Sequence, residues 1–188
     1  MDEAELIARS QKGDQDSFQL LMERYRADLS RTAYLTSRDS ETARDIVQET
    51  LVQLWKSLPA YRPTGSFRAW MLKVLLNQSY RQYRRKRVQT VPLDEAMGLE
   101  SGAESPHTVA QREEEHQMVR EALAGLSNDH REVLILRYFS ELTVPEIAQT
   151  LSCRQGTVKS RLSRAQEQLR DALTAGAMKP IDLREAQS

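Results

Sequence analysis

The stretch from Phe67 to Arg87 constrains the fold more than any other part of the chain, because its first half predicts a helix that is apolar over most of its circumference. Its apolar residues recur at helical spacing: Phe67, Trp70, Met71, Val74 and Leu75. A helix of this kind has to be packed on more than one side. We therefore expect other helices to surround it and form a helical domain.

One stripe of the same helix breaks the apolar pattern. Its members are separated by four, three and four residues and so share one face: Lys73, Asn77, Tyr80 and Arg84. Arg81 flanks the stripe, and a basic run from Arg84 to Arg87 closes the segment. A basic stripe with an interleaved aromatic suits a polyanion that has exposed bases. A solvated helix end whose charges serve solubility fits the same residues, so both interpretations remain open here.

Charge is sorted along the chain, although 27 basic and 27 acidic residues give a net charge of zero. No acidic residue occurs between Thr50 and Leu93, a window that is rich in lysine and arginine. The stretch that follows is acidic, from Asp94 to the run Glu113–Glu115. This order indicates a basic surface for a polyanion, followed by a negative segment that could shield that surface or repel DNA.

Composition excludes several classes of protein. Of the 188 residues, 39% are hydrophobic and 29% are charged, which is typical of a globular chain and not of a disordered one. No apolar run approaches the length that spans a bilayer, so we expect no membrane insertion. Because Cys153 is the only cysteine and the three histidines are scattered, we expect no disulfide, metal or cofactor, and a reducing, cytoplasmic location.

Three more helices are expected before the central one, over Glu3–Gln11, roughly Phe18–Ala33, and Glu41–Leu58. Gly13 ends the first of them, Asp14 or Asp16 caps the second, and Pro59 stops the third. The third helix carries an apolar stripe that should face the core: Val47, Leu51, Leu54 and Leu58. A second, more polar face gathers Asp45, Gln48, Glu49 and Val52.

The character of the chain changes between Thr90 and Thr108, where prolines, glycines and serines replace any sustained periodicity. We expect a linker there that is at least partly disordered in isolation. A second helical domain follows, with helices expected over Val109–Leu126 and Asn128–Phe139.

The stretch TVPEIAQTLSCRQGTVKSRLSRAQEQLRDAL predicts a helix-turn-helix. Thr143 and Glu146 form a capping box around Pro145, and a short turn at Ser152 and Cys153 separates the two helices. The second helix has a core stripe of Val158, Leu162, Ala165 and Leu169. Its opposite face carries Gly156, Ser160 and Ser163, flanked by Thr157, Lys159 and Arg164, which suits insertion into a major groove. An ordinary helical hairpin is the alternative.

Four motifs in this order resemble one family, the bacterial RNA polymerase sigma factors of the extracytoplasmic-function (group IV) type. The opening segment ELIARSQKGDQDSFQLLMERY is similar to the family's first helices, and DIVQETLVQLW to the segment that binds the polymerase clamp. The segment GSFRAWMLKVLLNQSYRQYRRKR resembles the helix that melts and reads the minus-ten element. LTVPEIAQTLSCRQGTVKSRLSRAQEQLR resembles the helix-turn-helix that reads the minus-thirty-five element.

The resemblance implies an all-α fold of two small domains joined by a flexible linker. A domain like sigma region 2 would occupy residues 1–89, an acidic linker 90–116, a domain like sigma region 4 residues 117–175, and a tail 176–188. It also implies a protein that is not an enzyme. Its partners would be core RNA polymerase, promoter DNA and an inhibitory anti-sigma factor.

The resemblance assigns roles to three sets of residues. Contacts with the polymerase clamp would come from Asp45, Gln48, Glu49 and Val52. The minus-ten element would meet Arg62, Thr64, Ser66, Lys73, Asn77, Tyr80, Arg81, Arg84 and Arg85, with the loop from Tyr61 to Ser66 capturing a flipped base. The minus-thirty-five element would meet Arg154, Gln155, Gly156, Thr157, Lys159, Ser160, Ser163 and Arg164.

Two further expectations follow. The family usually has Gly-Ile-Ser before the recognition helix, whereas this chain has Ser152-Cys153-Arg154, so the start of that helix is uncertain. The isolated chain should bind promoter duplex weakly, because a linker without structure gives its two domains no fixed separation. Tight binding by the free chain would instead favour the alternative function, a stand-alone helix-turn-helix regulator.

Overall fold

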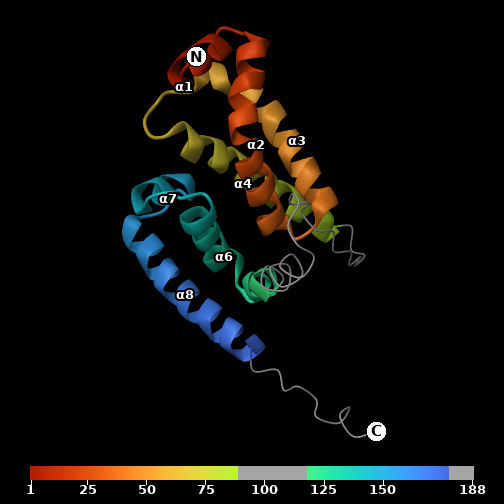
Figure 1. Ribbon diagram of the computed structural model, residues 1–188, viewed down its shortest axis with the longest axis vertical. Helices are drawn as coiled ribbons and strands as arrows, with labels where there is room; N and C mark the ends of the chain where they lie inside the picture. Colours follow the sequence, from red (N-terminus) through yellow and green to blue (C-terminus); the bar gives the residue numbers. More distant parts are fainter. Residues whose placement is uncertain (89–117, 178–188) are drawn as a thin grey trace, which may run out of the picture.

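The computed structural model describes residues 1–88 and 118–177, and the regular secondary structure of both stretches is helical (Figure 1). The N-terminal half contains α1 (Glu3–Gln11), α2 (Gln15–Ser37), α3 (Ser40–Ser57), the short η1 (Leu58–Ala60) and α4 (Phe67–Val88). The C-terminal half contains a helix over 118–125, α6 (Asn128–Leu134), η2 (Ile135–Phe139), α7 (Val144–Thr150) and α8 (Gln155–Ala177). The all-α prediction is confirmed. The expected linker lies outside the described residues, as does the tail beyond Ala177.

Side-chain caps set the helix boundaries of the N-terminal half. Asp14 rather than Asp16 caps α2, because its Oδ1 accepts a hydrogen bond from the Ser17 backbone N–H at 3.1 Å. Asp39 caps α3 in the same way, after Arg38 has ended α2 in the left-handed conformation with φ of 65°. The boundaries predicted around Gly13 and Pro59 are confirmed.

Helix α4 is the centre of the N-terminal half, as its apolar circumference predicts. Met71, Leu72 and Leu75 are completely buried, and α2 and α3 both pack against the helix. The predicted core stripe of α3 is partly wrong. Leu54 and Leu58 are buried, but Ile46 takes the third buried position, while Val47 and Leu51 are half-buried along a groove between α2 and α3.

The C-terminal half folds as the predicted helix-turn-helix with one supporting helix pair. Ser127 caps α6, and the helix expected over Asn128–Phe139 changes after Leu134 to π-type hydrogen bonding, which widens its last turn. The capping box of Thr143 and Glu146 is present at the start of α7. The part of the predicted Val109–Leu126 helix that precedes residue 118 lies outside the described residues.

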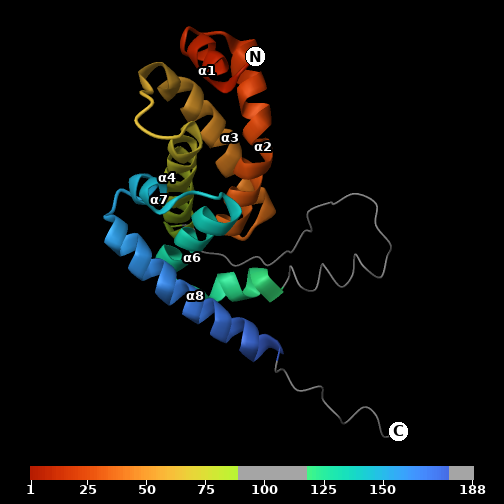
Figure 2. The same cartoon turned by 60° about the vertical axis from the view of Figure 1, so that its left-hand side comes forward.

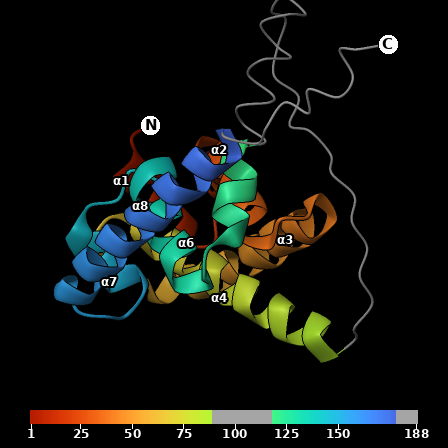
Figure 3. The same cartoon turned by 90° about the horizontal axis from the view of Figure 1, so that it is seen from below.

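The two halves pack against each other, so the expectation that they keep no fixed separation is wrong. Helix α7 lies beside α4 in Figures 1 and 2, and η2 contacts α2. Seen from below, in Figure 3, α6, α7 and α8 lie across the N-terminal helices. Their apolar residues form part of one continuous buried cluster. Nothing in the sequence periodicity predicts this contact, because it joins residues far apart in the chain.

Candidate functional site

The face of α3 that was assigned to a polymerase contact is accessible. Asp45, Gln48 and Val52 are exposed, and the Val52 side chain retains 54% of its accessible surface. Glu49 is half-buried and forms an ion pair of 2.9 Å with Arg85 of α4. The structure thus joins two residues that the sequence assigned to different partners, clamp and DNA.

The polar stripe of α4 lies on one face, but its members differ in exposure. Asn77, Arg81, Arg84 and Arg85 are exposed to solvent. Lys73 is half-buried, and both it and Tyr80, which remains 39% exposed, reach across to the C-terminal half. The Lys73 Nζ donates to Ser152 Oγ at 2.9 Å and to the Gln149 carbonyl oxygen at 3.3 Å, near the end of α7.

Tyr80 donates its hydroxyl hydrogen to Glu132 Oε2 of α6 at 2.5 Å. Glu132 is only 4% exposed, and burial raises the pKa of its carboxyl above the ordinary value. The hydrogen bond from Tyr80 opposes this shift by stabilising the carboxylate, so burial is the larger effect on the Glu132 pKa. The contact therefore places an ionisable group in a nearly closed interface.

The loop from Tyr61 to Ser66 is anchored at its first residue by aromatic packing. The Tyr61 ring lies 4.7 Å from that of Trp70 and 5.5 Å from that of Phe67, centroid to centroid. From α1, Gln11 Nε2 donates to the carbonyl oxygens of Leu58 and Tyr61. The predicted DNA contacts Arg62, Thr64 and Ser66 follow this anchor and are exposed.

A cavity of about 220 Å³ lies between this loop and α4, and α7 contributes one wall. Trp70, Lys73 and the loop line it from the N-terminal half, and Gln149 and Thr150 line it from α7. Gln149 Nε2 donates to Thr64 Oγ1 at 3.3 Å. The absence of a side chain at Gly65 permits this approach, since a Cβ there would lie 2.6 Å from Gln149 Oε1.

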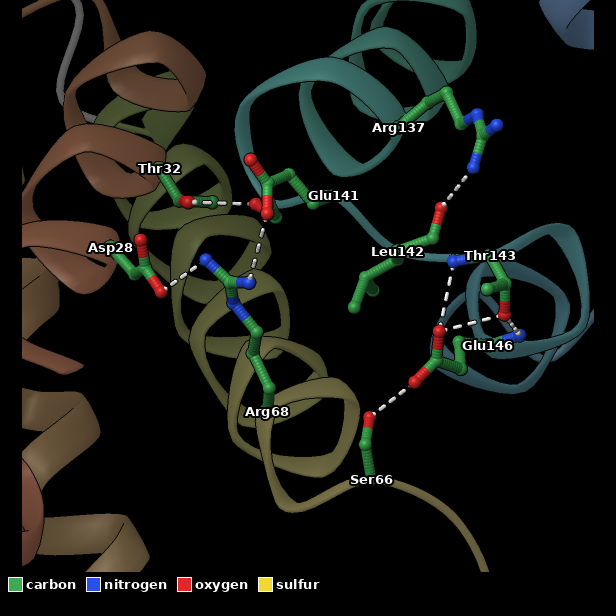
Figure 4. A network of polar contacts seen from close by, with 10 residues as sticks. Asp28, Thr32, Ser66, Arg68, Arg137, Glu141, Leu142, Thr143 and Glu146 are labelled. Carbon is green, nitrogen blue, oxygen red and sulfur yellow. Dashed lines mark hydrogen bonds and ion pairs between the residues drawn. The ribbon is translucent and has the colours of Figure 1, made fainter. Parts of the chain in front are cut away.

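Glu146 has two roles, of which the sequence analysis identified only one. Its Oε2 closes the capping box of α7 by accepting from Thr143 N at 2.8 Å, and its Oε1 accepts from Ser66 Oγ at 2.5 Å (Figure 4). These two sets of bonds, led by that from Ser66, hold the pKa of the Glu146 carboxyl below its ordinary value. Ser66 also caps α4 by accepting from Ala69 N. Its hydrogen bond to Glu146 therefore joins the N-terminal ends of α4 and α7.

A second network at the junction of the halves was missed by sequence reasoning. Arg68 forms an ion pair of 2.5 Å with Asp28 of α2 and lies 3.9 Å from Glu141 (Figure 4). Nearby, Thr32 Oγ1 and Ser140 Oγ are 3.3 Å apart, and both residues are 1% exposed. Only the basic window that contains Arg68 was visible in the sequence, and no spacing rule connects it to Glu141.

The recognition helix α8 is open to solvent along its predicted DNA-facing side. Every residue assigned to the minus-thirty-five contact is exposed, from Arg154 to Arg164, while the core stripe of α8 points inward. The helix begins at Gln155, and the Arg154 carbonyl oxygen accepts from Val158 N at 3.2 Å. Arg154 therefore occupies the N-cap position through its backbone, which resolves where this helix starts.

We expect Glu132→Gln to stabilise the protein at neutral pH. The wild-type carboxyl has a raised pKa, so the folded state loses stability as pH rises from the ordinary glutamate pKa through that raised value. The amide keeps an acceptor for Tyr80 without a buried charge. Thermal unfolding followed by circular dichroism should show a higher Tm at neutral pH and no advantage at acid pH.

Glu167→Gln is the matched control, because Glu167 is exposed on α8. This control should leave Tm nearly unchanged at every pH. Equal effects of the two substitutions would contradict a special cost for the buried carboxyl.

Among residues 1–88 and 118–177, no group of three or more histidine, cysteine or carboxylate side chains is placed to hold a metal ion. No helix in these ranges is both long and apolar enough to cross a membrane. Cys153 is half-buried at the turn before α8 and packs against the apolar cluster.

Comparison with known families matches each half of the chain to a different model. Residues 21–88 match the model described as Sigma-70 region 2, and residues 116–169 match Sigma-70, region 4. The chain is 34% identical over 173 residues to the ECF RNA polymerase sigma-E factor of Salmonella typhimurium, covering 86% of this chain and 89% of that protein.

Two solved structures are similar over both halves. One is CnrH in complex with the cytosolic domain of CnrY, with a TM-score of 0.70, 28% identity, and coverage of 90% of this chain and 96% of that one. The other is the sigma factor RpoE in complex with the anti-sigma factor NepR from Bartonella quintana. It has a TM-score of 0.68, 28% identity, and coverage of 85% and 98%.

Proposed function

The chain belongs to the extracytoplasmic-function (ECF) sigma factors of the sigma-70 family, and from this premise we propose which of its surfaces bind core polymerase and which bind promoter DNA. Sigma factors are non-catalytic subunits that bind core RNA polymerase and direct it to promoter DNA. The function of this chain is therefore to direct transcription initiation.

We propose that residues 1–89 bind core polymerase through the α3 face of Asp45, Gln48, Glu49 and Val52. The exposed carboxylate of Asp45 and the half-buried one of Glu49 suit a basic partner helix, and Val52 offers an apolar contact beside them. The groove between α2 and α3 lies next to this face and includes Gln48 in its wall.

The minus-ten element is proposed to contact the loop and the α4 stripe. The cavity between them is lined by Trp70 and Lys73, an aromatic ring and a cation, which suits an unpaired base and its phosphate. Unpairing a base costs a few kcal/mol, and capture of the extruded base can offset much of this cost. The basic side chains further along α4 would follow the strand.

Residues 117–175 are proposed to read the minus-thirty-five element with α8. The start of α8 presents small and polar side chains, while Lys159 and Arg164 lie beside them for phosphate contacts. Residues 90–116 are proposed as the connecting linker and 176–188 as a tail. A cytoplasmic location and regulation by an anti-sigma factor are further proposals, the latter because the similar RpoE structure is a complex with one.

The observation that supports this assignment of surfaces is that one chain presents two separate polar surfaces. An exposed acidic face on α3 and an exposed recognition face on α8 are both presented to solvent. A stand-alone helix-turn-helix regulator needs the second surface but has no use for the first.

We expect Asn77→Ala to impair promoter opening by about tenfold while closed-complex binding stays nearly unchanged, since one side chain–base contact contributes roughly 1–3 kcal/mol. Asn77 is exposed at the middle of the stripe, so its truncation leaves the core intact. Permanganate footprinting of the holoenzyme on a promoter that it selects would report unpaired thymines.

The control for this experiment is Gln15→Ala. Gln15 is also an exposed amide, but it lies on α2, away from the α4 stripe. It should leave the permanganate pattern unchanged. Full thymine reactivity with Asn77→Ala would show that other residues manage melting.

A further inference from the structure

Another cavity, of about 290 Å³, lies where the two halves of the chain meet, away from the loop at Tyr61–Ser66. The end of α2, the start of α3 and the second half of α4 line it from the N-terminal half, and α6 lines it from the C-terminal half. Two arginines contribute to its wall, Arg38 from the turn between α2 and α3 and Arg131 from α6. Each half of the chain thus supplies one cation to the same space.

Arg131 has hydrogen-bonding capacity that the protein does not use. Only 4% of this residue is exposed, yet it forms no ion pair among residues 1–88 and 118–177. Its Nη2 donates to two neutral oxygens, Asn128 Oδ1 at 2.5 Å and the Leu126 carbonyl oxygen at 3.5 Å. Its Nε and Nη1 donate to no described residue, and neither atom is sealed from solvent. These two nitrogens are therefore free to donate to a ligand in the cavity.

The two arginines are held close together without a counter-ion. Burial lowers the pKa of the Arg131 guanidinium, and the nearby charge of Arg38 lowers that pKa further. Burial also lowers the pKa of Arg38, although this side chain is more exposed. Because a guanidinium stays protonated in proteins, both groups remain cations that repel each other. An anion between them would offset this repulsion.

Glu132 is the one carboxylate among the described residues that line the cavity. One of its oxygens already accepts a hydrogen bond from Tyr80, and burial raises the pKa of its carboxyl, which favours the neutral form. Two arginines therefore face one carboxylate, and the cavity keeps an excess of positive charge in either protonation state of Glu132.

The size of the cavity and its donors narrow the class of ligand. A volume of 290 Å³ lies at the lower end of the range for small-molecule sites, about 300–1,000 Å³, so a compact ion fits best. The planar fork of a guanidinium matches the oxygens of a phosphate. Gln82 and Tyr83 of α4 line the same cavity and make no hydrogen bond within the described part of the chain, so they offer further donors.

We propose that this cavity binds a small phosphate-bearing anion, such as a diphosphate, between Arg38 of one half and Arg131 of the other. The site goes beyond the proposed function, because neither polymerase binding nor promoter recognition requires it. Phosphate oxygens would accept hydrogen bonds from both guanidinium groups, and Gln82 and Tyr83 would bind from the α4 side. A ligand that binds only the folded chain raises its thermal stability, so the bound anion should raise Tm.

Isothermal titration of the full chain with inorganic pyrophosphate, at constant ionic strength, tests the site. We expect saturable binding of one anion and a Tm that rises with its concentration. Arg38→Asn should weaken binding by about tenfold or more, because a charge-assisted interaction is lost. Asparagine tolerates the left-handed conformation of this position, where φ is 65°, so the fold should be kept. Arg31→Asn is the matched control, since Arg31 is exposed on α2 outside the cavity, and it should keep the affinity.

Two further variants locate the anion. Glu132→Gln should strengthen binding by about threefold or more at mildly alkaline pH, because it removes the carboxylate that opposes an anion. Arg84→Gln with Arg85→Gln removes two exposed cations of α4 outside the cavity and should leave the affinity nearly unchanged. The site would be overturned by absence of saturable binding, by equal affinities of the wild type and Arg38→Asn, or by loss of binding in the α4 pair.

Nucleic acid is the other source of phosphate, and a short single-stranded DNA of mixed sequence distinguishes the two. Because Arg131 is almost completely buried, we expect an excess of this DNA not to displace pyrophosphate from the wild type. Displacement would assign the cavity to strand phosphates and reject the small anion. Neither result bears on the sigma assignment, because the titration contains no polymerase and no promoter.

Discussion

Reversing two carboxylates on α3, Asp45→Arg with Glu49→Arg, is expected to abolish co-purification with core RNA polymerase while leaving the fold intact. Asp45 is exposed and Glu49 half-buried, so neither substitution disturbs the apolar core. Like charges placed across an interface cost several kcal/mol, so binding should weaken by about 100-fold or more. Affinity would be measured by pull-down and titration with core polymerase, and circular dichroism would check the helical content.

The matched control is Glu167→Arg with Asp171→Arg on α8. This pair has the same four-residue spacing and the same change of charge, and both residues are exposed. Arg85→Ala is a second control, because it removes the 2.9 Å ion pair of Glu49 without changing the acidic face and should not weaken binding. Undiminished co-purification of the α3 variant would show that another surface binds polymerase.

Leu75→Ala in the middle of α4 should destabilise the N-terminal half by about 2–5 kcal/mol, because a completely buried leucine leaves a cavity among the helices packed around it. Urea unfolding followed by the fluorescence of Trp70, on the same helix, and of Trp55 would measure the loss. The size of this effect follows from the central position of α4, which touches both α2 and α3.

Leu20→Ala makes the same chemical change where the side chain retains 52% of its accessible surface. Its effect should stay within about 0.5 kcal/mol, as for other surface substitutions. Similar losses for Leu75→Ala and Leu20→Ala would mean that α4 is not the buried centre of the domain.

Local sequence patterns predicted the helices well, because the signals that end helices are themselves local. The Thr143–Glu146 box acts within one turn of the chain, so its spacing alone identifies it. The α3 stripe was partly misassigned because Ile46 and Val47 are neighbours, and periodicity alone cannot decide which of two adjacent apolar residues faces the core.

The contact between the halves was beyond the reach of sequence reasoning for a physical reason. It includes polar pairs such as Tyr80 with Glu132 and Ser66 with Glu146, which are 52 and 80 residues apart. Each of these side chains is also a plausible solvent-facing residue, so composition gives no sign that it has a partner. Thr64, Lys73 and Tyr80 were assigned to DNA, and their present contacts with the C-terminal half appear only in three dimensions.

The most direct test is transcription by purified core polymerase with this chain, on fragments of bacterial genomic DNA. It tests whether the chain binds polymerase with one surface and promoter DNA with others. We expect discrete start sites with unpaired thymines upstream, absent with core polymerase alone and lost with Asp45→Arg and Glu49→Arg together. The contrary result is tight, sequence-selective duplex binding by the free chain with no polymerase-dependent start sites. That outcome would identify a stand-alone regulator in which the α3 face has no polymerase to bind.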